Sequence, residues 1–153
     1  MLEDIESARG ELQRAEHLIY VTLKYTRTGD VMKSIVERLI DSMNYSITDM
    51  LEFTKHKNKI KEFPASDMAK FELLKVILKK LILKDKNLKK YLDLYLLLKK
   101  VSKTPVTSVR EEYRKNLTLI ADDIEIDMST IVEYYNDVKE FFIFSRTWIK
   151  ENN

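Results

Sequence analysis

Apolar residues recur at three- and four-residue steps through most of this chain, which is the spacing that places them on one face of an α-helix. The first such stretch extends from about Leu2 to Thr26, and the second from about Val31 to Lys57. Between them, Gly29 is the expected end of the first helix. Asp30 is the expected N-cap of the second, because its carboxylate can accept a hydrogen bond from a free backbone N–H. The pattern therefore predicts two amphipathic helices before residue 58.

The longest periodic stretch, from about Asp67 to Lys103, follows a connection that contains Pro64. Ser66 or Asp67 is the expected N-cap of this stretch. The apolar density drops at residues 84–87, so the pattern leaves open whether the stretch forms one helix or two. In either form the apolar positions share one face and several lysines lie on the opposite side.

The last third of the chain predicts a weaker helix and a stronger one. The weaker helix extends from about Val106 to Ala121, and Asp122–Asp127 is the expected acidic loop after it. Thr130 and Glu133 have the spacing of a capping box, which opens the last helix. Together the stretches predict an all-α fold, a single-domain antiparallel bundle of four to six helices over residues 1–153.

The composition agrees with this fold class. The 153 residues include only two glycines and two prolines, whereas all-β folds with many turns need far more of both. Without cysteine, disulfides, thiolate zinc sites and cysteine nucleophiles are excluded. The first twelve residues are acidic and amphipathic, unlike a signal peptide, and no apolar run approaches the roughly 18 residues that cross a bilayer. We therefore expect a soluble, cytoplasmic protein with no membrane contact.

Positive charge is concentrated in the middle of the chain. Residues 55–103 carry fifteen lysines and five acidic residues, a formal charge of +10, while residues 1–54 and 104–153 each carry −4. One interpretation is a surface that binds RNA phosphates without sequence preference. The candidate phosphate contacts are Lys75, Lys79, Lys86 and Lys90. The segment has no arginine and few aromatic residues, which disfavours base-specific recognition. In the other interpretation the lysines form a solvated face that complements the acidic helices.

The sequence gives little support for catalytic or metal-binding chemistry. His17 lies beside the apolar face of the first stretch and is expected at the edge of the core, while His56 is expected on the surface. Neither histidine has a second ligand at a metal-binding spacing. The acidic residues 122–127 resemble part of a calcium loop but lack its central glycine. We expect no metal, no cofactor and no enzymatic activity.

Three segments carry a resemblance to a known family. They are ARGELQRAEHLIYVTLKY near the start, SIVERLIDSMNYSITDMLEF in the second stretch, and EEYRKNLTLIADDIEIDMSTIVEYYNDVKEFFIFSRTWI at the end. In order and character they resemble the helices of the HEPN-type helical bundle. The resemblance implies that the last segment forms a basic, polar helix, a short loop and an amphipathic helix rich in acidic and aromatic residues.

The resemblance also bears on ribonuclease activity. Ribonucleases of this family use an arginine followed, after four to six residues, by a histidine that transfers a proton. None of the seven arginines of this chain is followed by histidine at that spacing. The positions that remain of the pattern are Arg110, Arg114 and Asn116. The resemblance therefore implies a degenerate member that serves as a binding or scaffold module.

These observations support three hypotheses. The first is a non-catalytic helical interaction or scaffold module that forms a homodimer or binds a partner protein through an exposed helix face. The second is an RNA-binding protein that uses the lysine-rich segment 55–103. The third is a HEPN-like ribonuclease, independent of metal and centred on Arg110, Arg114 and Asn116.

Overall fold

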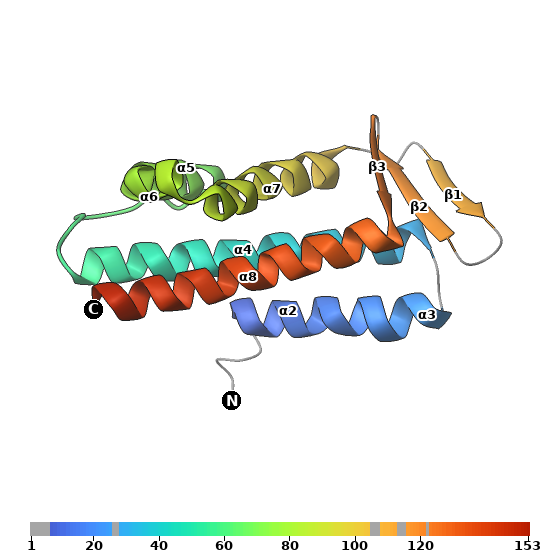
Figure 1. The fold of residues 1–153 in the computed structure, drawn as a ribbon, viewed down its shortest axis with the longest axis horizontal. Helices are drawn as coiled ribbons and strands as arrows, with labels where there is room; N and C mark the ends of the chain where they lie inside the picture. Colours follow the sequence, from blue (N-terminus) through green and yellow to red (C-terminus); the bar gives the residue numbers. More distant parts are fainter. Residues whose placement is uncertain (1–6, 26–27, 105–107, 113–115, 122) are drawn as a thin grey trace.

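A computed structural model describes residues 7–25, 28–104, 108–112, 116–121 and 123–153. The chain forms a bundle of helices that lie along one long axis, with a small β-sheet at one end (Figure 1). This arrangement confirms the all-α class that the apolar spacing predicts.

Two long helices run side by side through the middle of the bundle (Figure 1). They are α4 (Gly29–His56) and α8 (Met128–Asn152). Phe53 near the end of α4 packs edge-on against Trp148 near the end of α8, with ring centroids 5.7 Å apart. The two helices are therefore parallel, which the long connection between them permits.

The amino-terminal helices cover one side of this central pair. They are α2 (Ala8–His17), the π-helix η1 (Leu18–Thr22) and α3 (Leu23–Tyr25). The hydroxyl of Ser42 in α4 donates a hydrogen bond to the carbonyl of Ala8 at 2.9 Å, so the start of α2 lies beside the middle of α4. α2 runs antiparallel to both α4 and α8, as predicted for neighbouring helices.

The lysine-rich segment covers the opposite side of the central pair (Figure 1). It forms three helical pieces, α5 (Asp67–Ile77), α6 (Lys79–Lys84) and α7 (Lys86–Lys103). The breaks fall at Leu78 and at Asp85. Of these two residues, Asp85 has an extended backbone, which interrupts the helix. The drop in apolar density at residues 84–87 thus marks a real break. The break at Leu78 lies inside a continuous apolar pattern and was not expected.

The core is centred on α4, which contacts α2, α5, α7 and α8. One face of α4 is completely or almost completely buried along its length, as the three- and four-residue steps predict. The buried residues of that face include Met32, Ile35, Leu39, Met43, Ile47 and Met50.

The predicted helix over 106–121 is wrong, because this part of the chain contains strands. β1 (Ser108–Glu112), β2 (Asn116–Ala121) and β3 (Ile124–Asp127) form an antiparallel sheet in the order β1-β2-β3. The acidic loop expected over 122–127 is, from residue 124, the strand β3.

An alternating pattern explains the strands. Along β3, Ile124 and Ile126 are turned inward while Glu125 and Asp127 are exposed, the period of two that a half-buried strand requires. Leu119 of β2 pairs with Ile126, and both are fully buried. The apolar spacing before residue 121 fits a helix in part, but pairing with β3 decides in favour of the strand.

Side-chain caps fix where the helices begin. Ser66 caps α5, as expected, by accepting a hydrogen bond from the Ala69 N–H. Thr28, not Asp30, caps α4. The cap of α8 is Asp127, the last residue of β3, and not Thr130. The helix therefore starts directly at the end of the sheet.

Loss of the Asp127 cap is expected to destabilise the protein by about 1 kcal/mol in Asp127→Ala. The carboxylate accepts hydrogen bonds from the Thr130 N–H at 2.8 Å and from the Ser129 hydroxyl at 3.0 Å. The bond from Thr130 lowers the pKa of Asp127 below its ordinary value of 3.8. Because the folded-state pKa is lowered, this stabilisation is present above pH 3.8 and is lost as the pH falls through the folded pKa.

Urea denaturation at pH 7 and at pH 3 measures both effects. Asp127→Asn keeps an acceptor without a titratable charge, so its contribution is expected to change less with pH than that of Asp127. An Asp127→Ala variant as stable as the wild type at pH 7 would show that the cap contributes nothing.

Candidate functional site

The short helix α6 is held at the surface by its neighbours. Its flanks are anchored by Leu78, which is 1% exposed, and by Leu88 at the start of α7, also 1% exposed. Asp85 between α6 and α7 accepts hydrogen bonds from the N–H groups of Asn87 and Leu88, and so caps α7. None of the six residues of α6, all of which the structure describes, is buried. The helix α6 therefore lies at the surface, and the two leucines that flank it are buried in the core.

One face of α6 combines lysines with an exposed leucine. At 3.6 residues per turn, Lys79, Leu83, Lys80 and Lys84 lie within about 140° of arc. Leu83 is 82% exposed, the highest value among the large apolar side chains described, and Val76, near the end of α5, is 70% exposed. Single exposed apolar residues are ordinary, but Leu83 lies among the lysines of α6, and Val76 is exposed just before that helix begins.

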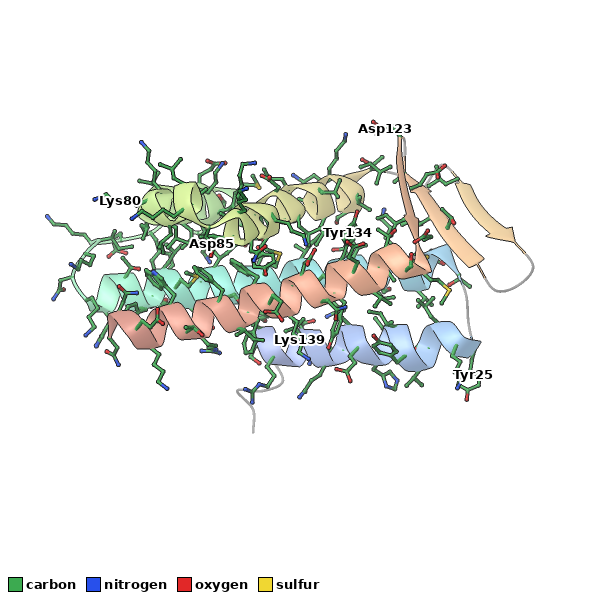
Figure 2. All side chains as sticks on the ribbon, viewed as in Figure 1. Tyr25, Lys80, Asp85, Asp123, Tyr134 and Lys139 are labelled. Atoms are coloured by element: carbon green, nitrogen blue, oxygen red, sulfur yellow. The ribbon has the colours of Figure 1, made fainter. Side chains whose placement is uncertain are left out.

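We name this surface the α6 patch. It consists of Val76, Lys79, Lys80, Leu83, Lys84 and Lys86. All four of its lysines are exposed, and no carboxylate in the described part of the chain forms an ion pair with them. Figure 2 shows Lys80 on the layer of α5–α7, and Lys139 on the α2 side of α8.

The structure separates the four lysines that the sequence grouped together. Lys79 and Lys86 belong to the α6 patch. Lys75 is half-buried, with its ammonium 5.5 Å from the centre of the Phe71 ring. Lys90 pairs at 3.3 Å with Asp137 of α8. Lys75 and Lys90 thus each have a partner within the protein, whereas Lys79 and Lys86 form no ion pair with the described residues.

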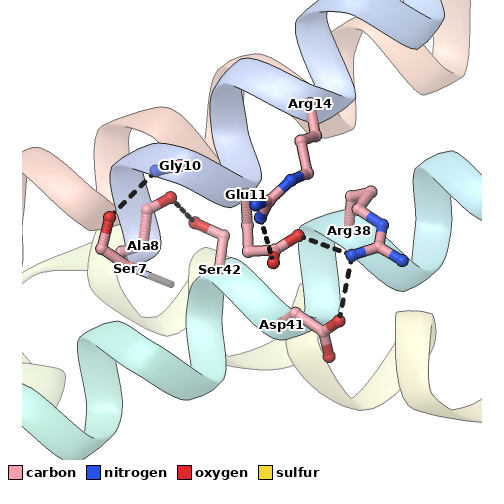
Figure 3. Close-up of polar contacts among 8 residues, drawn as sticks. All are labelled: Ser7, Ala8, Gly10, Glu11, Arg14, Arg38, Asp41 and Ser42. Atoms are coloured by element: carbon pink, nitrogen blue, oxygen red, sulfur yellow. Dashed lines mark hydrogen bonds and ion pairs between the residues drawn. The ribbon is translucent and has the colours of Figure 1, made fainter. Parts of the chain in front are cut away.

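A second polar site lies between α2 and α4 (Figure 3). Glu11 is only 5% exposed, although it is charged. Its two carboxylate oxygens accept hydrogen bonds from Arg14 at 2.6 Å and from Arg38 of α4 at 3.0 Å. Arg38 also lies 3.9 Å from Asp41. Two guanidinium groups and two carboxylates thus form a cluster without net charge.

This cluster fixes the position of α2 and is poorly suited to proton transfer. Burial, and then the negative charge of Glu11, raise the pKa of Asp41 above its ordinary value of 3.8. The partners of the two carboxylates are Arg14 and Arg38, and arginines stay protonated in proteins. Bonds of this kind specify the register in which two helices pack. No sequence motif identified Glu11, because a single glutamate on a helix is normally exposed.

Removal of the Glu11 charge in Glu11→Gln is expected to destabilise the protein by about 1–3 kcal/mol. The arginines are about two-fifths exposed and can return to water, which keeps the loss below that of a fully buried pair. Urea denaturation measures the free energy of unfolding of Glu11→Gln and of the control Glu72→Gln, which changes an exposed glutamate on α5. Equal stability of the two variants would contradict a locking role for Glu11.

The histidines do not form a catalytic arrangement with any residue in the described ranges. His17 is exposed at the end of α2, so its expected place at the edge of the core is wrong. His56 is exposed at the end of α4, as expected. Within the described residues, no group of three His, Cys, Asp or Glu side chains is placed to hold a metal ion.

Two of the three residues named by the family resemblance lie in the sheet. Arg110 is in β1, where it is paired in register with Thr118, and Asn116 of β2 is paired with Glu112. Arg114 lies outside the described residues. The backbone on which the resemblance expects a basic, polar helix thus forms strands where it is described.

Comparison of the chain with protein-family models, with curated proteins and with solved structures finds no match. Among the helices of the described residues, none has both the length and the hydropathy that a bilayer span requires.

Proposed function

We propose that this protein is a non-catalytic interaction module whose α6 patch binds an acidic segment of a partner protein. The observation that carries the proposal is a helix with no buried side chain that holds exposed lysines around Leu83. Such a helix contributes little to the core, so its sequence is free to serve binding. The absence of cysteine from the chain fits a reducing cytoplasm, where we propose that the module acts.

The mixture of side chains favours a protein over RNA as the partner. Val76 and Leu83 would be covered by apolar side chains of a partner helix, while the surrounding lysines would meet its acidic residues. A nucleic acid would leave these apolar side chains without complementary groups, because bases stack on aromatic rings and on arginine. The patch contains neither.

Binding of three labelled probes, measured by fluorescence anisotropy, tests the proposal. They are a helical peptide with one glutamate face and one leucine face, an unstructured glutamate peptide of equal charge, and poly(U). We expect the first peptide to bind at least about tenfold more tightly than the others at moderate salt. Tighter binding of poly(U), lost as salt is raised, would instead support the RNA hypothesis.

The variant Leu83→Ser separates the two classes of partner. The affinity for the helical peptide is expected to fall about tenfold, because the peptide buries this side chain. The affinity for poly(U), which does not bury it, is expected to stay unchanged. An equal effect on both probes would contradict apolar recognition by the patch.

We also propose that the protein self-associates, through a surface other than the α6 patch. A symmetric pair of α6 patches would bring the lysines of both copies together, which is unfavourable. An apolar alternative is offered by η1 and α3, where Tyr20, Val21 and Tyr25 are 55%, 43% and 80% exposed. Light scattering is expected to give a mass about twice 18.2 kDa, and the monomer mass for a Tyr20→Ser/Tyr25→Ser variant. A monomer for the wild type would overturn self-association.

A further inference from the structure

A pocket of about 360 Å³ is lined by residues from the ends of α4 and α8. These helix ends lie at the end of the bundle opposite the sheet (Figure 1). The pocket lies between the last turns of α4 and α8, the connection that follows α4, and the end of α5. Its aromatic, aliphatic and cationic lining consists of Phe53, Lys57, Lys59, Ile60, Ile77 and Trp148. The volume is at the small end of the range for ligand sites.

The inner part of the pocket is apolar and aromatic. The rings of Phe53 and Trp148 meet edge-on, with an interplanar angle of 76°. Both rings are half-buried, as are Ile60 and Ile77, so part of each side chain remains open to the pocket. A planar ring can stack on one of the two aromatic faces while its edge meets the other ring.

The rim of the pocket is positively charged. Lys57 and Lys59 are exposed, and the Lys57 ammonium is 5.9 Å from the centre of the Phe53 ring. No carboxylate lines the pocket, and neither lysine forms an ion pair with any carboxylate of the described residues. The rim therefore offers two cations to a ligand anion.

The backbone holds these rim residues in place. Asn58 has a left-handed conformation with φ of 60°, and the N–H of Lys59 donates to the carbonyl of Thr54 at 3.1 Å. The N–H of Asn58 donates to the carbonyl of Lys55 at 2.9 Å. These two bonds form a Schellman motif, which satisfies the end of α4 and turns the chain back along it. The motif places Lys57, Lys59 and then Ile60 around the same opening.

We propose that this pocket binds a small aromatic carboxylate. The ring lies against Phe53 and Trp148, and the carboxylate meets the ammonium groups of Lys57 and Lys59. Two flexible ammonium groups suit a single carboxylate, whereas a polyphosphate would call for more cations or for backbone N–H groups. This site is separate from the α6 patch, so the proposal stands whether or not the patch binds a partner protein.

Trp148 reports directly on the pocket, because it is the only tryptophan in the chain. Its emission is followed while the full-length protein is titrated with phenylacetate, with the uncharged phenylacetamide and with the non-aromatic cyclohexylacetate. We expect a saturable change with phenylacetate, and at least tenfold weaker binding of the other two compounds. Equal affinities for all three, or no saturable change with phenylacetate, would overturn the proposal.

Variants of the two rim lysines test whether their charges are required for binding of the carboxylate. In Lys57→Gln/Lys59→Gln, the affinity for phenylacetate is expected to fall at least tenfold and the affinity for phenylacetamide to stay unchanged. Lys150→Gln, an exposed lysine of α8 that does not line the pocket, is the matched control and should bind phenylacetate like the wild type. Both variants change exposed side chains, and circular dichroism verifies that they fold. Unaltered phenylacetate affinity in Lys57→Gln/Lys59→Gln would overturn the assignment of these lysines.

Discussion

Replacement of Phe141 by alanine is expected to lower the free energy of unfolding by about 3–5 kcal/mol. Phe141 of α8 is fully buried. Its ring packs edge-on against Tyr91 of α7, with centroids 6.5 Å apart, and near-parallel to Phe144 at 6.3 Å. The contact with Tyr91 joins the central pair of helices to the α5–α7 layer. Truncation leaves a cavity between these layers, and the expected loss is a large part of the stability of a domain of this size.

Urea denaturation of Phe141→Ala, Phe141→Leu and Lys139→Ala tests this packing. The leucine variant fills part of the cavity and should lose less than the alanine variant. Lys139 is exposed on the same helix, so Lys139→Ala should stay within about 0.5 kcal/mol of the wild type. A loss below about 1 kcal/mol in Phe141→Ala would contradict the packing of α7 on α8 described above.

Charge reversal in the α6 patch is expected to have the largest effect on binding. The variant Lys80→Glu/Lys84→Glu replaces two attractions to an acidic partner with two repulsions. We expect the glutamate–leucine peptide to bind at least about 100-fold more weakly, because opposed like charges cost several kcal/mol at an interface. The fold should be unaffected, since both side chains are exposed and form no ion pair with the described residues.

The control for this reversal is Lys139→Glu/Lys150→Glu, which makes the same change of charge on α8. If binding depended only on the overall charge of the protein, the two double variants would lose the same amount of affinity for the peptide. If the α6 patch is the binding surface, the control should lose no more than a few-fold at moderate salt, where distant charges are screened. Anisotropy titrations of both variants at 150 mM salt decide between these results.

The helical part of this fold can be read from the sequence because local spacing and tertiary packing agree. The buried positions of α4, such as Ile35, Leu39 and Met43, are those that three- and four-residue steps select. The sheet could not be read in the same way. Leu119 and Ile126 are buried by pairing across β2 and β3, a contact that helical spacing along one segment does not reveal.

The α6 patch was only partly predictable for a related reason. The excess of lysine in residues 55–103 is plain in the sequence, but which of these lysines find a partner on another helix, as Lys90 does with Asp137 of α8, depends on tertiary packing. Lys80 and Lys84 lie about 100° and 140° around α6 from Lys79, outside the arc that Lys75, Lys79, Lys86 and Lys90 share on a continuous helix, so helical spacing does not group them with those lysines. Leu83 lies outside the apolar stripe of the segment, and this mismatch is the signal that could have indicated an exposed leucine.

Mapping the binding surface by NMR tests the central proposal most directly. The ¹⁵N-labelled full-length protein is titrated with the unlabelled glutamate–leucine peptide, and the change in each backbone amide shift is recorded. We predict that the largest changes fall in residues 76–86, with much smaller changes in α2 and in the exposed face of α8. Largest changes at Tyr20–Tyr25 or in the sheet, or no change at all, would contradict the assignment of the α6 patch as the interaction surface.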